Sequence, residues 1–180
     1  PKPVQDGGVP VYAGGGSEEG RNMIANYCDH YLMHGGSVDK IAGDIEDMRE
    51  RRADAGGDPD AMEFGMAAYV ICRDTEAEAQ AELDRITTVD PEAEGFDSYE
   101  EFLENSELDD EVDLKDYSVS NRGLRPDLVG TPEQITEKLR AYADVGLDLV
   151  LLQCSPMLEE VQRIGRDLIP RLDEEEVAVR

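Results

Sequence analysis

Short apolar-rich runs alternate with amphipathic segments along this chain, and that alternation most limits the fold it can adopt. Each run predicts a strand, and each following segment carries apolar residues three and four positions apart, the spacing of one helix face. Residues 64–72 are almost all apolar, as expected for a strand buried on both faces. We expect strands at residues 9–13, 30–33, 64–72 and 147–153, each followed by a helix.

Repeated βα units predict a parallel sheet covered by helices, in an α/β fold. Two architectures fit: a doubly wound sheet, or part of a (β/α)8 barrel. A whole barrel needs eight strands and typically about 250 residues. This chain has 180 residues and four predicted strands, so as part of a barrel it would supply half of one.

Helix starts are marked by side chains that can accept a hydrogen bond from the first free N–H groups. Four such caps are expected, at Ser17, Ser37, Thr75 and Thr131. Ser155, which precedes Pro156, predicts a fifth start, that of the last helix. The apolar spacing of this last helix turns Leu158, Val161, Ile164 and Leu168 toward the core.

One segment breaks the alternation. Residues 90–125 are acidic and poor in apolar side chains. We therefore expect a single domain over residues 1–172 with an insertion at 90–125, followed by an acidic tail at 173–180.

The chain is strongly acidic, with a formal net charge of −26. This charge argues against binding to nucleic acid or to an anionic membrane, because like charges repel. The acidic residues are spread along the whole sequence, a pattern that suits a protein kept hydrated in concentrated salt, as in halophiles. Three cysteines beside apolar runs indicate reduced thiols and a cytoplasmic location, and no metal-binding spacing, signal peptide or membrane span is evident.

A glycine-rich turn follows the first predicted strand. The glycines at 14–16 lead into Ser17, which is placed to cap the next helix. Backbone N–H groups converge at such a helix start, where the helix dipole is positive, and this suits a phosphate. The same residues also suit an ordinary turn with a capped helix. They match neither the dinucleotide-binding fingerprint nor the P-loop pattern.

Several short motifs occur in a fixed order along the chain. They are Lys2-Pro3-Val4-Gln5, Pro10-Val11-Tyr12-Ala13-Gly14-Gly15-Gly16-Ser17, Leu128-Val129-Gly130-Thr131-Pro132-Glu133-Gln134, Val145-Gly146-Leu147-Asp148 and Ile169-Pro170. Over residues 1–172 this set resembles the C-terminal half of the bacterial luciferase-like flavin-dependent monooxygenases, in the branch that oxidises alkanesulfonates and dimethyl sulfone. The resemblance implies a TIM barrel of which this chain supplies about the last four βα units.

The resemblance also implies an activity, that of a monooxygenase that uses reduced FMN and O2 on a small organosulfur substrate. A separate flavin reductase would deliver the FMN, and the full-length form would be a homo-oligomer. The FMN phosphate is expected at Gly15, Gly16, Ser17 and Gly20. The carboxylates of Glu18 and Glu19 would repel it unless they point away. Two alternatives stay open: a deazaflavin-dependent hydride-transfer oxidoreductase, and a non-catalytic half-barrel fragment that needs a partner.

Two residues are candidates for catalysis. His34 directly follows the second predicted strand, and barrel active sites lie at the carboxyl ends of strands, although a polar loop residue is equally expected there. Arg122 lies close to the position where sulfonate-oxidising relatives carry an arginine, and its planar guanidinium suits a sulfonate. The alternative for Arg122 is a surface ion pair. Ser155 departs from the family pattern, because some relatives carry an aromatic residue there.

Overall fold

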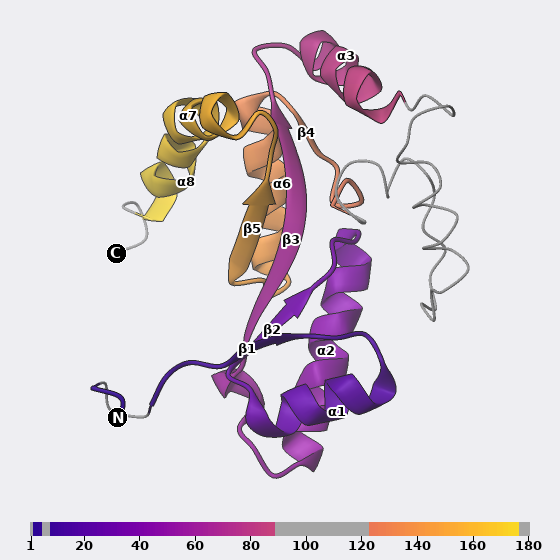
Figure 1. The fold of residues 1–180 in the computed structure, drawn as a ribbon, viewed down its shortest axis with the longest axis vertical. Helices are drawn as coiled ribbons and strands as arrows, with labels where there is room; N and C mark the ends of the chain where they lie inside the picture. Colours follow the sequence, from indigo (N-terminus) through magenta and orange to yellow (C-terminus); the bar gives the residue numbers. More distant parts are fainter. Residues whose placement is uncertain (1, 5–7, 89–122, 177–180) are drawn as a thin grey trace.

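A computed structural model of the protein describes residues 2–4, 8–88 and 123–176. Most of the predicted insertion at 90–125 lies outside these residues. Helices and strands alternate along the chain (Figure 1). In chain order they are β1 (Tyr12–Gly14), α1 (Glu18–Tyr27), β2 (His30–Met33), α2 (Val38–Asp54), a short 3-10 helix (Pro59–Ala61), β3 (Glu63–Cys72), α3 (Glu76–Thr87), β4 (Leu128–Gly130), α6 (Pro132–Asp144), β5 (Leu149–Gln153), α7 (Met157–Asp167) and α8 (Ile169–Glu176).

All strand pairs in the sheet are parallel, and β3 lies at its centre. The residues of β2 align with Glu63–Met66, and those of β5 align with Gly65–Tyr69. β4 pairs with the end of β3, at Val70–Cys72, and β1 extends the sheet beyond β2. Figure 1 shows β5 on one side of β3 and β4 on the other. The predicted parallel α/β architecture is confirmed.

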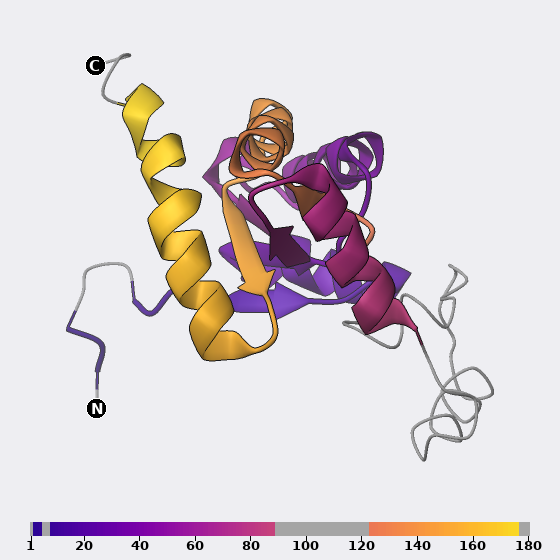
Figure 2. The same cartoon turned by 90° about the horizontal axis from the view of Figure 1, so that it is seen from above.

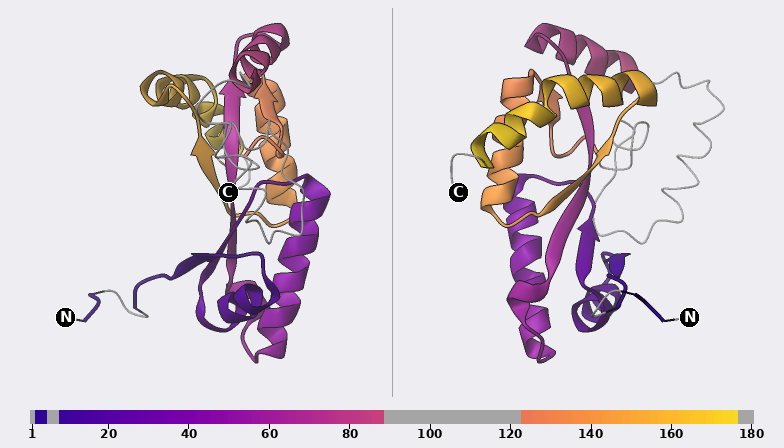
Figure 3. Two further views of the ribbon diagram at one scale, coloured as in Figure 1. Left: turned by 45° about the vertical axis from the view of Figure 1, so that its right-hand side comes forward. Right: turned by 90° about the vertical axis from the view of Figure 1, so that its left-hand side faces the viewer.

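The main core lies between the sheet and its covering helices. Successive side chains of a strand point to opposite faces, and every second residue of β3, from Phe64 to Cys72, belongs to this core. The face of α2 predicted from its spacing, Ile41, Ile45 and Met48, is buried against it. Figure 3 shows α2 and α6 aligned along one side of the sheet. Phe64 therefore fills the space beneath the helices rather than a barrel interior.

The opposite face of the sheet is covered at one end and open at the other. The end of β3 packs under α3 in a second apolar cluster. Nearer the start of the sheet, Tyr12, Leu149 and Leu151 lie on this same face and are 50%, 43% and 55% exposed. The interior of a closed (β/α)8 barrel is lined by this face of its strands. The open sheet thus has the shape of part of a barrel, as predicted.

The first strand is shorter and more exposed than the buried strand predicted at 9–13. It spans Tyr12–Gly14, and Val9 and Val11 before it are exposed. Within the described residues β1 pairs with β2 alone. Its other edge therefore lacks a neighbour that would cover these side chains.

The predicted inward face of the last helix is only half correct. Ile164 and Leu168 are buried in the main core. Leu158 and Val161, which were expected beside them, are 67% and 52% exposed. Viewed from above, α7 and α8 lie along the side of the sheet formed by β5 (Figure 2). The spacing predicted an apolar face correctly, but the described elements cover only part of it.

The boundaries at the end of the chain also differ from the prediction. The N-cap of α7 is Pro156 rather than Ser155, and no side chain caps this helix. Helix α8 continues through Glu176, so the start of the tail predicted at 173–180 is helical. The strand β4 was missed altogether, because three residues are too few to give a periodic pattern.

Two expectations from composition concern the cysteines and the membrane. Cys28, Cys72 and Cys154 are buried, and none forms a disulfide. Burial raises the pKa of the Cys72 thiol to about 11, so this thiol stays protonated at neutral pH. None of the helices in the described part of the chain is long and apolar enough to cross a membrane.

The two faces of the sheet predict unequal costs for the same substitution. Leu128 is fully buried and Leu151 is 55% exposed. We expect Leu128→Ala to lower the free energy of unfolding by about 2–5 kcal/mol, because it leaves a cavity. Leu151→Ala should cost less than about 1 kcal/mol, because most of its side chain is already in water. Urea unfolding of the 180-residue chain measures both, and equal losses would show that the open face is covered in solution.

Candidate functional site

The glycine-rich turn connects the carboxyl end of β1 to the start of α1. Ser17 is the N-cap of α1, and its hydroxyl accepts a hydrogen bond from the Gly20 N–H at 3.1 Å. Gly15, Gly16 and Ser17 are exposed. A Cβ atom at Gly16 would meet no atom within 4 Å. The turn therefore presents its backbone to open space directly in front of a helix N-terminus.

This arrangement suits an anionic group such as a phosphate. The first N–H groups of a helix lack partners within it, and the helix dipole adds positive potential there. The Ser17 hydroxyl accepts from Gly20 and can still donate its own hydrogen. A Cβ atom at Gly20 would lie 3.1 Å from the Ser17 Oγ and crowd this cap. The structure thus brings the predicted residues Gly15, Gly16, Ser17 and Gly20 together.

The carboxylate of Glu18 does not oppose an anion at the turn. Both of its oxygens accept hydrogen bonds from the Arg51 guanidinium on α2, at 2.9 and 3.1 Å. These bonds hold the pKa of Glu18 below its ordinary value. The prediction required Glu18 to point away from the turn. It does so, toward a cation on the next helix.

Two other side chains close to the turn were missed by the sequence analysis. The Tyr31 hydroxyl on β2 donates a hydrogen bond to the Gly15 carbonyl at 2.8 Å. Arg21 on α1 forms ion pairs with Asp44 at 3.1 Å and Asp47 at 3.0 Å on α2. No motif signals either contact, because both depend on how separate elements align. A tyrosine within an apolar run looks like ordinary core.

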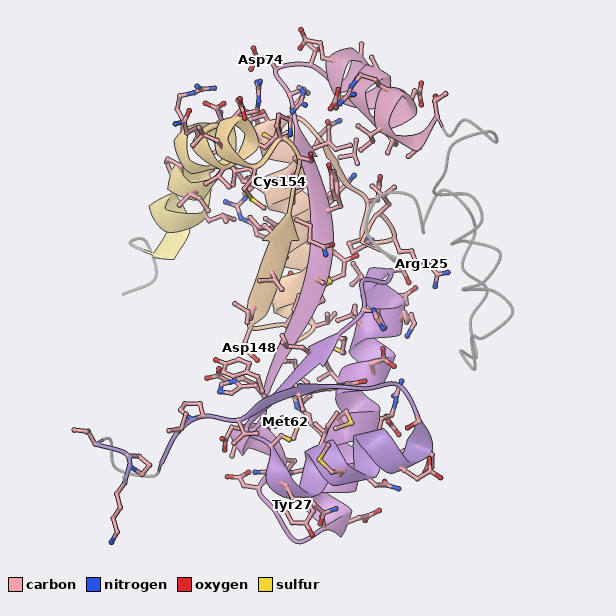
Figure 4. All side chains as sticks on the ribbon, viewed as in Figure 1. Tyr27, Met62, Asp74, Arg125, Asp148 and Cys154 are labelled. Atoms are coloured by element: carbon pink, nitrogen blue, oxygen red, sulfur yellow. The ribbon has the colours of Figure 1, made fainter. Side chains whose placement is uncertain are left out.

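His34 follows β2 and is exposed, at the same end of the sheet as the glycine turn. The next residue, Gly35, lies so close to Pro126 that a Cβ atom on it would be 2.7 Å from the proline ring. The loop after β2 therefore contacts the segment that closes the predicted insertion. Figure 4 shows Arg125 of this segment beside the start of α2. Arg122 lies outside the described residues, so its role stays a prediction, as does that of His34.

The loops after β3 and β5 are held by internal contacts. Arg73 forms an ion pair at 2.8 Å with Glu160 on α7, whose side chain is only 6% exposed. Cys154 is buried at the carboxyl end of β5 (Figure 4). Among the residues that the structure covers, no group of three or more His, Cys, Asp or Glu side chains could hold a metal ion.

Comparison with known proteins identifies the family. Residues 1–149 match the family model described as luciferase-like monooxygenase. The chain belongs to the luciferase-like monooxygenase family. This agrees with the resemblance seen in the ordered motifs.

Curated relatives of this luciferase-like chain are about twice its length. It is 35% identical over 181 residues to an FMNH2-dependent dimethylsulfone monooxygenase of Pseudomonas putida, covering 97% of this chain and 49% of the relative. It is 30% identical over 179 residues to a sulfoquinovose monooxygenase of Novosphingobium aromaticivorans, covering 90% of this chain and again 49% of the relative. The chain thus spans about half the length of the curated relatives it matches.

Solved structures show the same fold. An EDTA monooxygenase from Chelativorans sp. BNC1 superimposes with a TM-score of 0.70 at 18% identity, covering 98% of this luciferase-like chain and 49% of that one. DmoA from Hyphomicrobium sulfonivorans gives a TM-score of 0.67 at 19% identity, covering 92% of this chain and 41% of that one. An F420-dependent secondary alcohol dehydrogenase gives 0.59 at 18% identity, with coverage of 93% and 50%.

The ion pairs beneath the turn predict a pH-dependent stability. Hydrogen bonds from Arg51 lower the pKa values of Glu18 and Asp47 below their ordinary 4.5 and 3.8. A carboxyl whose pKa is lowered by folding stabilises the fold fully above its ordinary pKa. That contribution is lost as the pH falls through the lowered value.

Removal of the Arg51 cation tests this linkage. We expect Arg51→Met to be less stable than the wild type above about pH 5, with a difference that shrinks toward about pH 3. Urea unfolding across this range measures the difference. A difference that stays constant with pH would show that Arg51 acts through packing rather than through these carboxylates.

Proposed function

We propose that the whole protein, of which this chain forms part, is a reduced-FMN-dependent monooxygenase that acts on a small organosulfur compound. The observation that carries the proposal is the exposed glycine turn at the N-terminus of α1, whose geometry fits the phosphate of FMN. Membership of the luciferase-like family and similarity to a dimethylsulfone monooxygenase support it.

This chain would supply the phosphate anchor and part of the site around it. The N–H groups of the turn and the Ser17 hydroxyl would bind the phosphate oxygens. When bound, reduced FMN supplies the electrons with which O2 transfers one oxygen atom to the substrate. His34 and Arg122 are candidates to face that substrate, with the Arg122 guanidinium hydrogen-bonding its sulfonyl oxygens. A separate flavin reductase would provide the reduced FMN.

The test uses the full-length natural protein, however far it extends beyond these residues. Supplied with reduced FMN, O2 and dimethyl sulfone, it should consume the sulfone, whereas reduced FMN and O2 without the protein should leave the sulfone unchanged. Reduction of a deazaflavin by an alcohol, without consumption of sulfone, would instead support the hydride-transfer alternative.

A matched pair of serine variants tests the phosphate anchor. Ser17 caps α1 and Ser37 caps α2 through the same type of side-chain hydrogen bond. We expect Ser17→Ala to weaken FMN binding about three- to tenfold, because a donor to the phosphate is lost, and to leave riboflavin binding unchanged. Ser37→Ala removes a comparable cap and should leave the affinities for both ligands unchanged. Equal effects of the two variants on FMN would contradict the proposed anchor.

The alternative of another class is a non-catalytic half-barrel that needs a partner. The exposed leucines of β5 support this requirement for a partner, as does the edge of β1 that no strand of the described residues pairs with. Light scattering and thermal unfolding of the 180-residue chain test whether it needs a partner. A stable monomer that unfolds cooperatively would contradict this requirement. We further propose a cytoplasmic location and a homo-oligomeric full-length form.

We also propose that the protein functions in concentrated salt. The formal net charge is −26, and the acidic side chains repel one another in dilute buffer. Added salt shortens the screening length from about 10 Å at about 0.1 M to about 3 Å at about 1 M. We expect the melting temperature to rise by about 5 °C or more between about 0.1 M and 2 M KCl. Sucrose, which adds no ions, serves as the control. Equal stabilisation by sucrose would show that charge screening is not the cause.

A further inference from the structure

The hydroxyl of Tyr31 reaches the glycine turn from beneath. It lies on β2, sixteen positions away in sequence, and donates to the Gly15 carbonyl at 2.8 Å. The side chain is 3% exposed, and its backbone aligns with Ala13 on β1 and Phe64 on β3. The donor is therefore fixed by the sheet itself, at the point where the chain leaves β1.

This bond also sets the direction of the following N–H group. The Gly15–Gly16 peptide is trans, and in a planar trans peptide the C=O and N–H bonds point in opposite directions. Since the Gly15 carbonyl points inward to Tyr31, the Gly16 N–H must point outward. Gly16 is exposed, and a Cβ atom on it would meet no atom within 4 Å.

The Tyr31 hydroxyl is in the protonation state that its hydrogen bond to the Gly15 carbonyl requires. Burial raises the pKa of Tyr31 above its ordinary value of 10.0, so the hydroxyl keeps its proton at neutral pH. The nearby guanidinium of Arg21 is already paired with Asp44 and Asp47. Arg21 is therefore engaged by two carboxylates of α2, and the donors proposed for the phosphate stay the backbone N–H groups of the turn and the Ser17 hydroxyl.

We propose that Tyr31 is a positioning residue for the phosphate turn, whose hydroxyl holds the Gly15–Gly16 peptide so that the Gly16 N–H faces the ligand. This inference rests on the proposed function. Without the bond the peptide plane can rotate, since glycine permits a wide range of backbone angles. The Gly16 N–H then leaves the phosphate for part of the time, and affinity falls.

The test compares FMN with riboflavin, which has the same ring system and lacks the phosphate. In the full-length protein, Tyr31→Phe keeps the packed ring and removes the hydroxyl. We expect the Kd of oxidised FMN to rise about three- to tenfold and the Kd of riboflavin to stay unchanged. Tyr142→Phe is the matched control, because it removes an equally buried hydroxyl that donates to the Gly36 carbonyl at 2.7 Å. It should not alter the ratio of the two Kd values.

Each outcome has a distinct meaning. If wild-type protein binds FMN and riboflavin equally well, the proposed phosphate site itself fails. If the wild type prefers FMN and Tyr31→Phe keeps the full preference, the positioning role of Tyr31 is overturned while the phosphate site stands.

A second measurement needs no variant. Hydrogen exchange followed by NMR should show a rapidly exchanging Gly16 amide in the free protein and a protected one after addition of FMN. A Gly16 amide that is already protected in the free protein would overturn the inference, because the N–H would then be bonded internally.

Discussion

The parallel ladder around β3 is the constraint on which the other features depend. β3 pairs with β2, β4 and β5, and one of its faces carries the middle of the main core. β1 and β2 end level with Gly65 and Met66, whereas β3 continues to Cys72. This stagger places the loops that follow β1 and β2 beside the buried second half of β3, which continues past them. The Gly35 backbone, for example, approaches the Ala67 carbonyl too closely for any side chain.

Charge is the second constraint, because carboxylates at the start of α1 would repel an anion at the glycine turn. Arginines placed between α1 and α2 pair with carboxylates of both helices. Arg51 draws the Glu18 carboxylate off the turn, and Arg21 is held by Asp44 and Asp47. The Glu18 side chain is 70% exposed, and ion pairs as exposed as that contribute little to stability individually. Their effect is to decide where negative charge lies around the start of α1.

Local features were predictable from the sequence and long-range ones were not. The caps at Ser17 and Thr131 and the apolar face of α2 depend on residues within one or two turns, and the structure confirms them. The Tyr31 bond depends on strand register, which no spacing reveals. Leu158 was predicted inward because periodicity identifies an apolar face without showing what covers it, and the described elements leave it exposed. The roles of His34 and Arg122 stay predictions for a similar reason, since they depend on parts of the site beyond the described residues.

The glycine turn has a consequence for the medium in which such a site can operate. The donors that we propose for the phosphate are peptide N–H groups and the Ser17 hydroxyl at the start of α1, and no lysine or arginine side chain is among them. In about 1 M salt the screening length is about 3 Å, so the attraction between charges farther apart than this is largely screened. The two groups of a direct hydrogen bond are in contact, and no ion lies between them. We therefore expect molar salt to lower the phosphate affinity of a site made of fixed N–H dipoles less than that of a site made of lysine or arginine side chains. Backbone N–H groups can thus bind an anion at high salt concentration, where a positively charged patch binds it well only at low salt concentration.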